Sequence, residues 1–178
     1  MGAPSLAHYL DRAVDEGKSS LLSYDCYMQM QKDLAGLNIY FNNLREYGEA
    51  RKRTGVPFWN VVLSAMHYRY KRPYKEDMWW QLTTSVAHGA TGVSWFIIRL
   101  PDMWDNYRYP PVNQLGERTE QFTWLSEVNR TFQNYCGKIF AGLKFEDCCH
   151  IGNVYGGNKA FEPYGNLLDI RDADGTPL

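Results

Sequence analysis

Three β-rich runs, each preceded by a segment of helical periodicity, restrict the fold of this chain more than any other sequence feature. They cover about residues 20–24, 58–64 and 91–98. Their spacing of about 35 residues suits a strand–loop–helix unit, which needs roughly 30 residues or more. This alternation predicts a parallel sheet of the α/β class with right-handed crossovers.

The helices are indicated by apolar residues that recur every three or four positions. Ser5 is a fair N-cap for the first helix, while Gly55 and Gly89 suit the ends of the second and third. The four predicted helical segments are residues 5–16, 37–54, 78–88 and 122–136.

The pattern changes after Gly137 to short runs of β character, at residues 148–154 and 166–171. Three strand–helix units are too few to close a (β/α)8 barrel, which takes at least ~200 residues. We therefore expect either a small open sheet or a partial TIM barrel. In the second case residues 1–137 would hold about the last three βα units, and residues 138–178 would begin a β-rich domain that is truncated.

Charge and hydropathy argue against two classes of partner. The formal net charge of −1 gives no electrostatic reason to expect nucleic-acid binding. No apolar run approaches the ~18 residues of a membrane helix, so no membrane partner is expected. The N-terminus has neither a basic region nor an apolar run that would form a signal peptide, which leaves the parent protein cytoplasmic or secreted.

Motifs for metals and cofactors are also missing. None of the four cysteines shows C-x-x-C spacing, which favours reduced thiols over a zinc site or a disulfide framework. No glycine-rich phosphate loop is present, so neither dinucleotide nor P-loop chemistry is supported. We expect no cofactor and no metal.

Polar and aromatic residues gather where the predicted strands end. Aromatic residues make up 15% of the chain, and many stand among polar residues in these loops. Ligands of parallel α/β sheets bind at the C-terminal strand ends, and aromatic faces next to fixed donors and acceptors suit a sugar ring. The predicted substrate-binding residues are Asp25, Tyr27, Ser64, His67, Trp104 and Asp105.

Two of these residues, Asp25 and His67, also have a plainer interpretation. Asp25 is the best candidate for a catalytic carboxylate, but a structural role at a strand end fits it equally well. His67 fits a solvated loop as well as a site. His88, beside Gly89, is expected to be structural through the helix dipole. Three tryptophans are expected in the core: Trp59, Trp79 and Trp95.

Several segments resemble barrel glycoside hydrolases related to the barrel-type β-galactosidases and cellulases. Residues 23–27, Ser-Tyr-Asp-Cys-Tyr, resemble an S-Y-D-x-Y strand end of that clan. Residues 55–59 resemble the approach to its seventh strand, and residues 87–96 resemble the approach to its eighth. Gly116 and Thr119 resemble a G-x-x-T pattern before its final helix.

The resemblance implies that the three strands are the sixth, seventh and eighth of a barrel whose parent protein is an O-glycosyl hydrolase. Such enzymes usually hold two carboxylates beside the scissile bond. The acid/base Glu of the clan follows the fourth strand, which would lie outside this chain. Its nucleophile Glu ends the seventh strand, where this chain has Leu63-Ser64. The catalytic residues are therefore unknown, and the chain alone is expected to be inactive.

Two other hypotheses remain open. The chain could belong to a non-catalytic carbohydrate-binding or scaffold protein on a decayed barrel. It could also be a self-standing α/β protein that forms a homo-oligomer through its open half-barrel, because uncovered sheet edges and apolar faces favour association.

Overall fold

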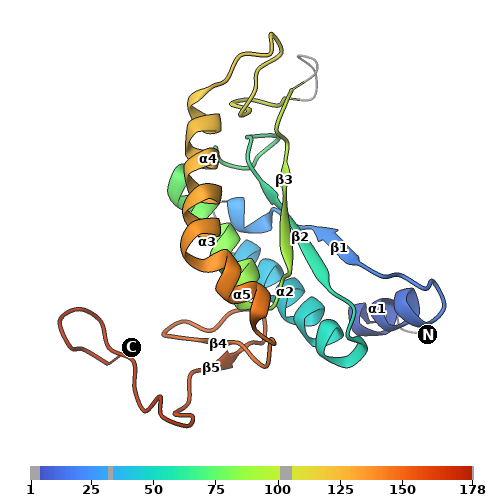
Figure 1. Ribbon diagram of the computed structural model, residues 1–178, viewed down its shortest axis with the longest axis vertical. Coiled ribbons are helices and arrows are strands. Elements are labelled where there is room, and N and C mark those ends of the chain that lie inside the picture. The colour runs from blue at the N-terminus through green and yellow to red at the C-terminus, as the bar shows by residue number, and fades with distance from the viewer. Residues whose placement is uncertain (1–4, 32–33, 101–105, 178) are drawn as a thin grey trace.

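A three-stranded parallel sheet forms the centre of the fold (Figure 1). The computed structural model describes residues 5–31, 34–100 and 106–177. Strands β1 (Leu22–Asp25), β2 (Phe58–Leu63) and β3 (Gly92–Phe96) lie side by side in chain order, and both neighbouring pairs are parallel. The predicted α/β class and the three predicted strands are confirmed.

Helices alternate with these strands. They are α1 (Leu6–Asp15), α2 (Leu34–Thr54), α3 (Lys75–Ala87) and α4 (Glu120–Phe132), with the short 3-10 helix η1 (Met28–Met30) after β1. The Oγ of Ser5 accepts a hydrogen bond of 3.2 Å from the His8 amide, as an N-cap should. Gly55, with φ of 74°, follows the last residue of α2. After α4 the chain continues through a π-helical turn, η2 (Gln133–Gly137), into α5 (Lys138–Gly142).

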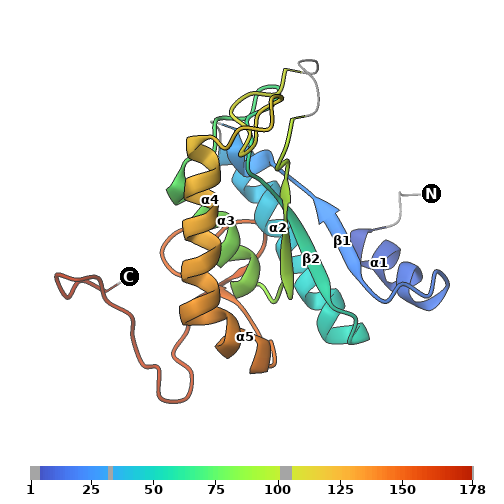
Figure 2. The same ribbon diagram turned by 45° about the horizontal axis from the view of Figure 1, so that its top comes forward.

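The helices cover one face of the sheet (Figures 1 and 2). Phe58 of β2 packs in a core with residues of α1 and α2, and Val93 of β3 packs against α3 and α4. Side chains alternate along a strand, so the residues between these point to the opposite face. There Ser23, Ser94 and Asp25 are exposed within the part of the chain that the structure describes.

Polar side chains lock α3 against β2. The Gln81 amide, fully buried, donates to the Leu63 carbonyl at 3.0 Å and accepts from the Leu63 amide at 2.9 Å. Gln29, just after β1, donates to the same Gln81 oxygen at 3.1 Å. Gln81 therefore satisfies both backbone groups at the end of β2, and a buried polar group needs such partners.

Two of the three tryptophans expected in the core are not buried. Trp59 is 43% exposed on the open face of the sheet, and Trp79 is 36% exposed on α3. Trp59 lies on the face that has no helix, which strand periodicity could not distinguish from the covered face. Trp95 is partly buried, and its indole donates to Asn129 of α4 at 3.1 Å.

The C-terminal part contains less β-structure than expected. Only β4 (Cys149–His150) and β5 (Lys159–Ala160) pair, in parallel, so the strand predicted over residues 148–154 is shorter. The strand predicted over residues 166–171 is wrong. This segment makes only isolated bridges, because no neighbouring strand lies alongside it. The figures show the last residues extending away from the helices.

None of the described helices is long and apolar enough to cross a membrane. The four cysteines all lie in the described ranges and are free thiols.

Candidate functional site

The ends of the three strands lie at the same edge of the sheet, and the loops after β2 and β3 gather there (Figure 2). The loop after β3 is tied to the loop after β2 by two backbone hydrogen bonds between Met66 and Arg108, of 2.9 and 2.8 Å. Residues that follow different strands therefore come together, as the sequence predicts for a parallel sheet.

Five rings form what we call the strand-end cluster: Tyr27, His67, Tyr70, Phe96 and Tyr107. Tyr27 stacks on Phe96 with ring centroids 5.8 Å apart and meets His67 edge-on at 5.5 Å. Tyr107 stacks on His67 at 5.1 Å, with an interplanar angle of 17°. Such offset and edge-to-face pairs stabilise aromatic clusters beyond their buried area, so the rings form a rigid group.

His67 is the polar centre of this cluster. It is only 5% exposed, and its Nδ1 atom is buried without a hydrogen-bond partner in the described part of the chain. Burial lowers the pKa of the imidazole, and the charge of Asp25 opposes this shift in part. The lowered pKa favours the neutral ring at pH 7, in which one nitrogen can donate a hydrogen bond and the other can accept one.

Asp25 is the exposed carboxylate of the described strand ends. It lies on the open face of β1, at the register position of Val61. Its charge helps to raise the pKa of Tyr27, although burial is the larger cause, and it also acts on His67. Asp25, Tyr27 and His67 are thus brought together as predicted.

Ser64 is not exposed at the strand ends, as a substrate-binding residue would need to be. It is fully buried, its hydroxyl donates to the Ile97 carbonyl at 3.2 Å, and its amide donates to the Phe96 carbonyl at 2.7 Å. It therefore extends the pairing of β2 with β3 beyond the strand ends. Trp104 and Asp105, the other two predicted residues, lie outside the described residues.

Arg72 links the loops behind the cluster. Its guanidinium lies 4.5 Å from the ring centroid of Tyr109 and 5.0 Å from that of Trp124. Its Nε donates to Gln121 at 3.0 Å, and Gln121 in turn donates to the Ser64 carbonyl at 3.3 Å. Arg72 thereby contacts Tyr109, which follows Tyr107 by two residues in the same loop.

Three other residues of this edge, Tyr70, Phe96 and Arg72, are not among the predicted substrate-binding residues. Phe96 belongs to a strand whose pattern predicts only a buried run, and Tyr70 and Arg72 lie in a loop without periodicity. Their roles depend on ring and guanidinium contacts between segments far apart in the sequence. The only available signal was the local density of Tyr and Arg.

Among the described residues that follow β1 at this edge, Asp25 is an exposed carboxylate beside an aromatic cluster. Two carboxylates are needed for ordinary glycoside hydrolysis, and Asp25 is a single candidate. Among the described residues, no three His, Cys, Asp or Glu side chains converge as metal ligands.

Comparisons with protein-family models, with curated proteins and with solved structures found no match to this chain. The geometry of the strand ends is therefore the basis for any assignment of function.

Proposed function

We propose that the chain is one sector of a (β/α)8 barrel of the glycoside-hydrolase type, and that its strand ends form part of a cleft for an oligo- or polysaccharide. The observation that carries this proposal is the exposed Asp25 carboxylate next to the strand-end cluster. A sugar presents a C–H face to aromatic rings and hydroxyl groups to carboxylate and imidazole.

The one-sided sheet supports the barrel part of the proposal. In a closed barrel, helices cover only the outer face, and the inner face is filled by side chains of the other strands. Trp59 and Val61 occupy the helix-free face here.

A second function, non-catalytic carbohydrate binding, is favoured by one observation. β2 ends in Leu63 and the buried Ser64, so this strand end offers no nucleophilic carboxylate. A barrel with one acid at its described strand ends can bind a glycan without cleaving it. Assays with aryl glycosides distinguish the two functions, because only the enzyme releases the aryl group.

Glycan-array binding by the protein tests the proposal. Asp25→Asn should weaken binding about tenfold, because a hydroxyl loses a charged acceptor. Asp15→Asn, which changes an exposed acid on α1, should leave binding unchanged. Product release that disappears in Asp25→Asn would favour the enzyme over the binding protein. Absence of glycan binding by the unmodified protein would overturn both functions.

A further inference from the structure

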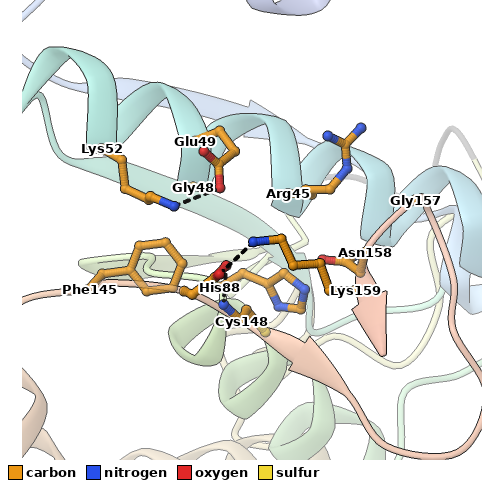
Figure 3. A pocket seen from close by; sticks show the side chains of 11 residues that line it. Arg45, Gly48, Glu49, Lys52, His88, Phe145, Cys148, Gly157, Asn158 and Lys159 are labelled. Atoms are coloured by element: carbon orange, nitrogen blue, oxygen red, sulfur yellow. Dashed lines mark hydrogen bonds and ion pairs between the residues drawn. The ribbon is translucent and has the colours of Figure 1, made fainter. Parts of the chain in front are cut away.

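A second cavity, distinct from the strand ends, lies between α2 and the segment of residues 145–159 (Figure 3). Its volume is about 320 Å³, which is at the lower end of the ~300–1,000 Å³ typical of small-molecule sites. Its lining includes Gly48, Glu49, Lys52, His88, Phe145, Asp147 and Lys159.

The wall opposite α2 is held in place by specific contacts. The Gly156 amide donates to Asn38 at 3.0 Å, and Arg45 Nε donates to the Gly156 carbonyl at 3.1 Å. Asn158 donates to the Phe41 carbonyl at 3.3 Å. These bonds join the segment to the backbone and side chains of α2, so the cavity is formed before any ligand binds.

Two ion pairs face each other across the cavity. Lys52 pairs with Glu49 on α2 at 3.0 Å, and Lys159 pairs with Asp147 on the opposite wall at 2.7 Å. The pairs also influence one another. The pKa of Asp147 is lowered first by its hydrogen bond with Lys159 and further by Lys52, and the raised pKa of Lys159 includes a contribution from Glu49.

The four charges form two pairs of opposite sign and sum to zero, and Arg45, the fifth charged side chain of the lining, is paired with Glu46 at 2.7 Å. An anion bound at either lysine would lie beside the carboxylate paired with it, and a cation bound at either carboxylate would lie beside its lysine, so repulsion between like charges opposes both. A hydroxyl group avoids this cost because it accepts from an ammonium group and donates to a carboxylate at the same time.

One side of the cavity is aromatic. The Phe145 ring lies so close to Gly48 and Gly89 that a Cβ atom at either position would lie within 3.3 and 2.6 Å of it, respectively. The absence of a side chain at these two glycines leaves the space that the ring occupies on the wall. At the back, the His88 ring is held by a 2.8 Å bond between its Nδ1 and the Thr84 carbonyl. Figure 3 shows Phe145, His88, Lys52, Glu49 and Lys159 around the same space.

We propose that this cavity binds a single neutral sugar ring or another cyclic polyol. Phe145 would pack against the carbon face of the ring, and Lys52, Glu49, Asp147 and Lys159 would bind its hydroxyl groups. Because the carboxylates already have partners, the affinity should be modest, with Kd on the order of 1 mM. The cavity is built from residues other than those of the strand ends, so the inference does not depend on the proposed function.

A titration of the ¹⁵N-labelled protein, followed by NMR, tests the proposal with D-glucose, D-galactose and myo-inositol as probes. Saturable shifts of the Gly48, Asp147 and Asn158 amides are expected with at least one probe. Inorganic phosphate and glycine serve as the charged probes in the same experiment. Saturation by either of these, without saturation by a polyol, would overturn the assignment, and so would the absence of any saturable shift.

Substitutions locate the binding. Asp147→Asn should weaken it about tenfold by removing a charged acceptor, and Lys159→Gln should do the same from the other member of the pair. Asp11→Asn removes an exposed ion pair with Arg53 elsewhere and should have no effect. Shifts confined to Asp25 and His67 would support the proposed function and contradict this second site.

Discussion

Gly156 illustrates how a single residue determines the position of the C-terminal segment. Its φ is 62°, and a Cβ atom there would lie 2.2 Å from the Asn42 amide nitrogen of α2. Both the backbone conformation and the space require glycine. Gly175 has a φ of 82°, but no atom lies within 4 Å of such a Cβ. The backbone conformation there favours glycine, whereas the space does not require it.

We therefore expect Gly156→Ala to release the segment from α2, at a cost of about 2–4 kcal/mol from backbone strain and overpacking together. Gly175→Ala should cost only about 1 kcal/mol, from strain alone. Limited trypsin digestion should show faster cleavage at Lys159 in the first variant and unchanged cleavage there in the second. Equal cleavage in both would mean that the close approach to α2 does not hold the segment.

Buried histidines should make stability depend on pH near neutrality. Burial lowers the pKa of His67, His88 and His150 in the folded protein. Each then binds a proton more readily when unfolded, where the pKa is about 6.5. The stabilising contribution is complete above that value and is lost as the pH falls through it toward the folded pKa.

The free energy of unfolding, measured with urea, should accordingly decrease between about pH 7.5 and 5.5. His88→Asn should reduce the slope, because it removes one of the three groups. His8→Asn changes a histidine on α1 and serves as the control. A constant free energy over this range would contradict the burial argument.

At the scale of elements, segments with strong helical periodicity could be predicted from the sequence, and segments with weak periodicity could not. The helix expected over residues 5–16 is α1 (Leu6–Asp15), and the glycines after α2 and α3 end them as expected. The π-helical turn of residues 133–137 left no sequence signal, because its apolar stripe continues that of α4. Residues 145–160 contain only the two short strands β4 and β5, and their position depends on contacts with α2 that a sequence pattern does not show.

The loops at the strand ends are connected by Arg72, which we expect to control the cluster. Arg72→Lys keeps the charge but loses the guanidinium geometry that reaches Gln121 and Glu120 together. The stacking of Tyr107 on His67 should loosen, and the imidazole proton resonances of His67 should lose their ring-current shift. Arg118→Lys is the matched control, since Arg118 lies 4.5 Å from the Phe122 ring centroid. Unchanged His67 resonances in Arg72→Lys would show that the loops hold their positions without it.

At the scale of the whole molecule, the sheet has one covered face and one open face. The sequence predicted the parallel strands, and it placed Asp25, Tyr27 and His67 correctly at one edge. It could not predict that Ser64 is buried, because its burial results from pairing between β2 and the residues after β3. Which face of the sheet stays open depends on the side against which the helices pack, and the periodicity within a strand does not specify that side.

An open sheet face with an unpaired edge favours association. We expect sedimentation velocity to show self-association that increases with protein concentration. Ser94→Lys places a charge on the open face, where Ser94 is exposed, and should shift the protein toward monomer without a loss of stability greater than about 0.5 kcal/mol. Thr83→Lys on α3 is the control, because it adds the same charge on the helix side. A monomer at all concentrations would show that this face does not self-associate.

The half-exposed indole of Trp59 gives the open face an optical reporter. Water contact shifts tryptophan emission to longer wavelengths and leaves the ring accessible to iodide quenching. Anything that came to rest on this side of the sheet, whether another part of a barrel or a second copy, would shift the emission to shorter wavelengths and protect the ring. Because five other tryptophans also emit, the difference between the spectra of the unmodified protein and of Trp59→Phe can reveal when the sheet acquires its second cover.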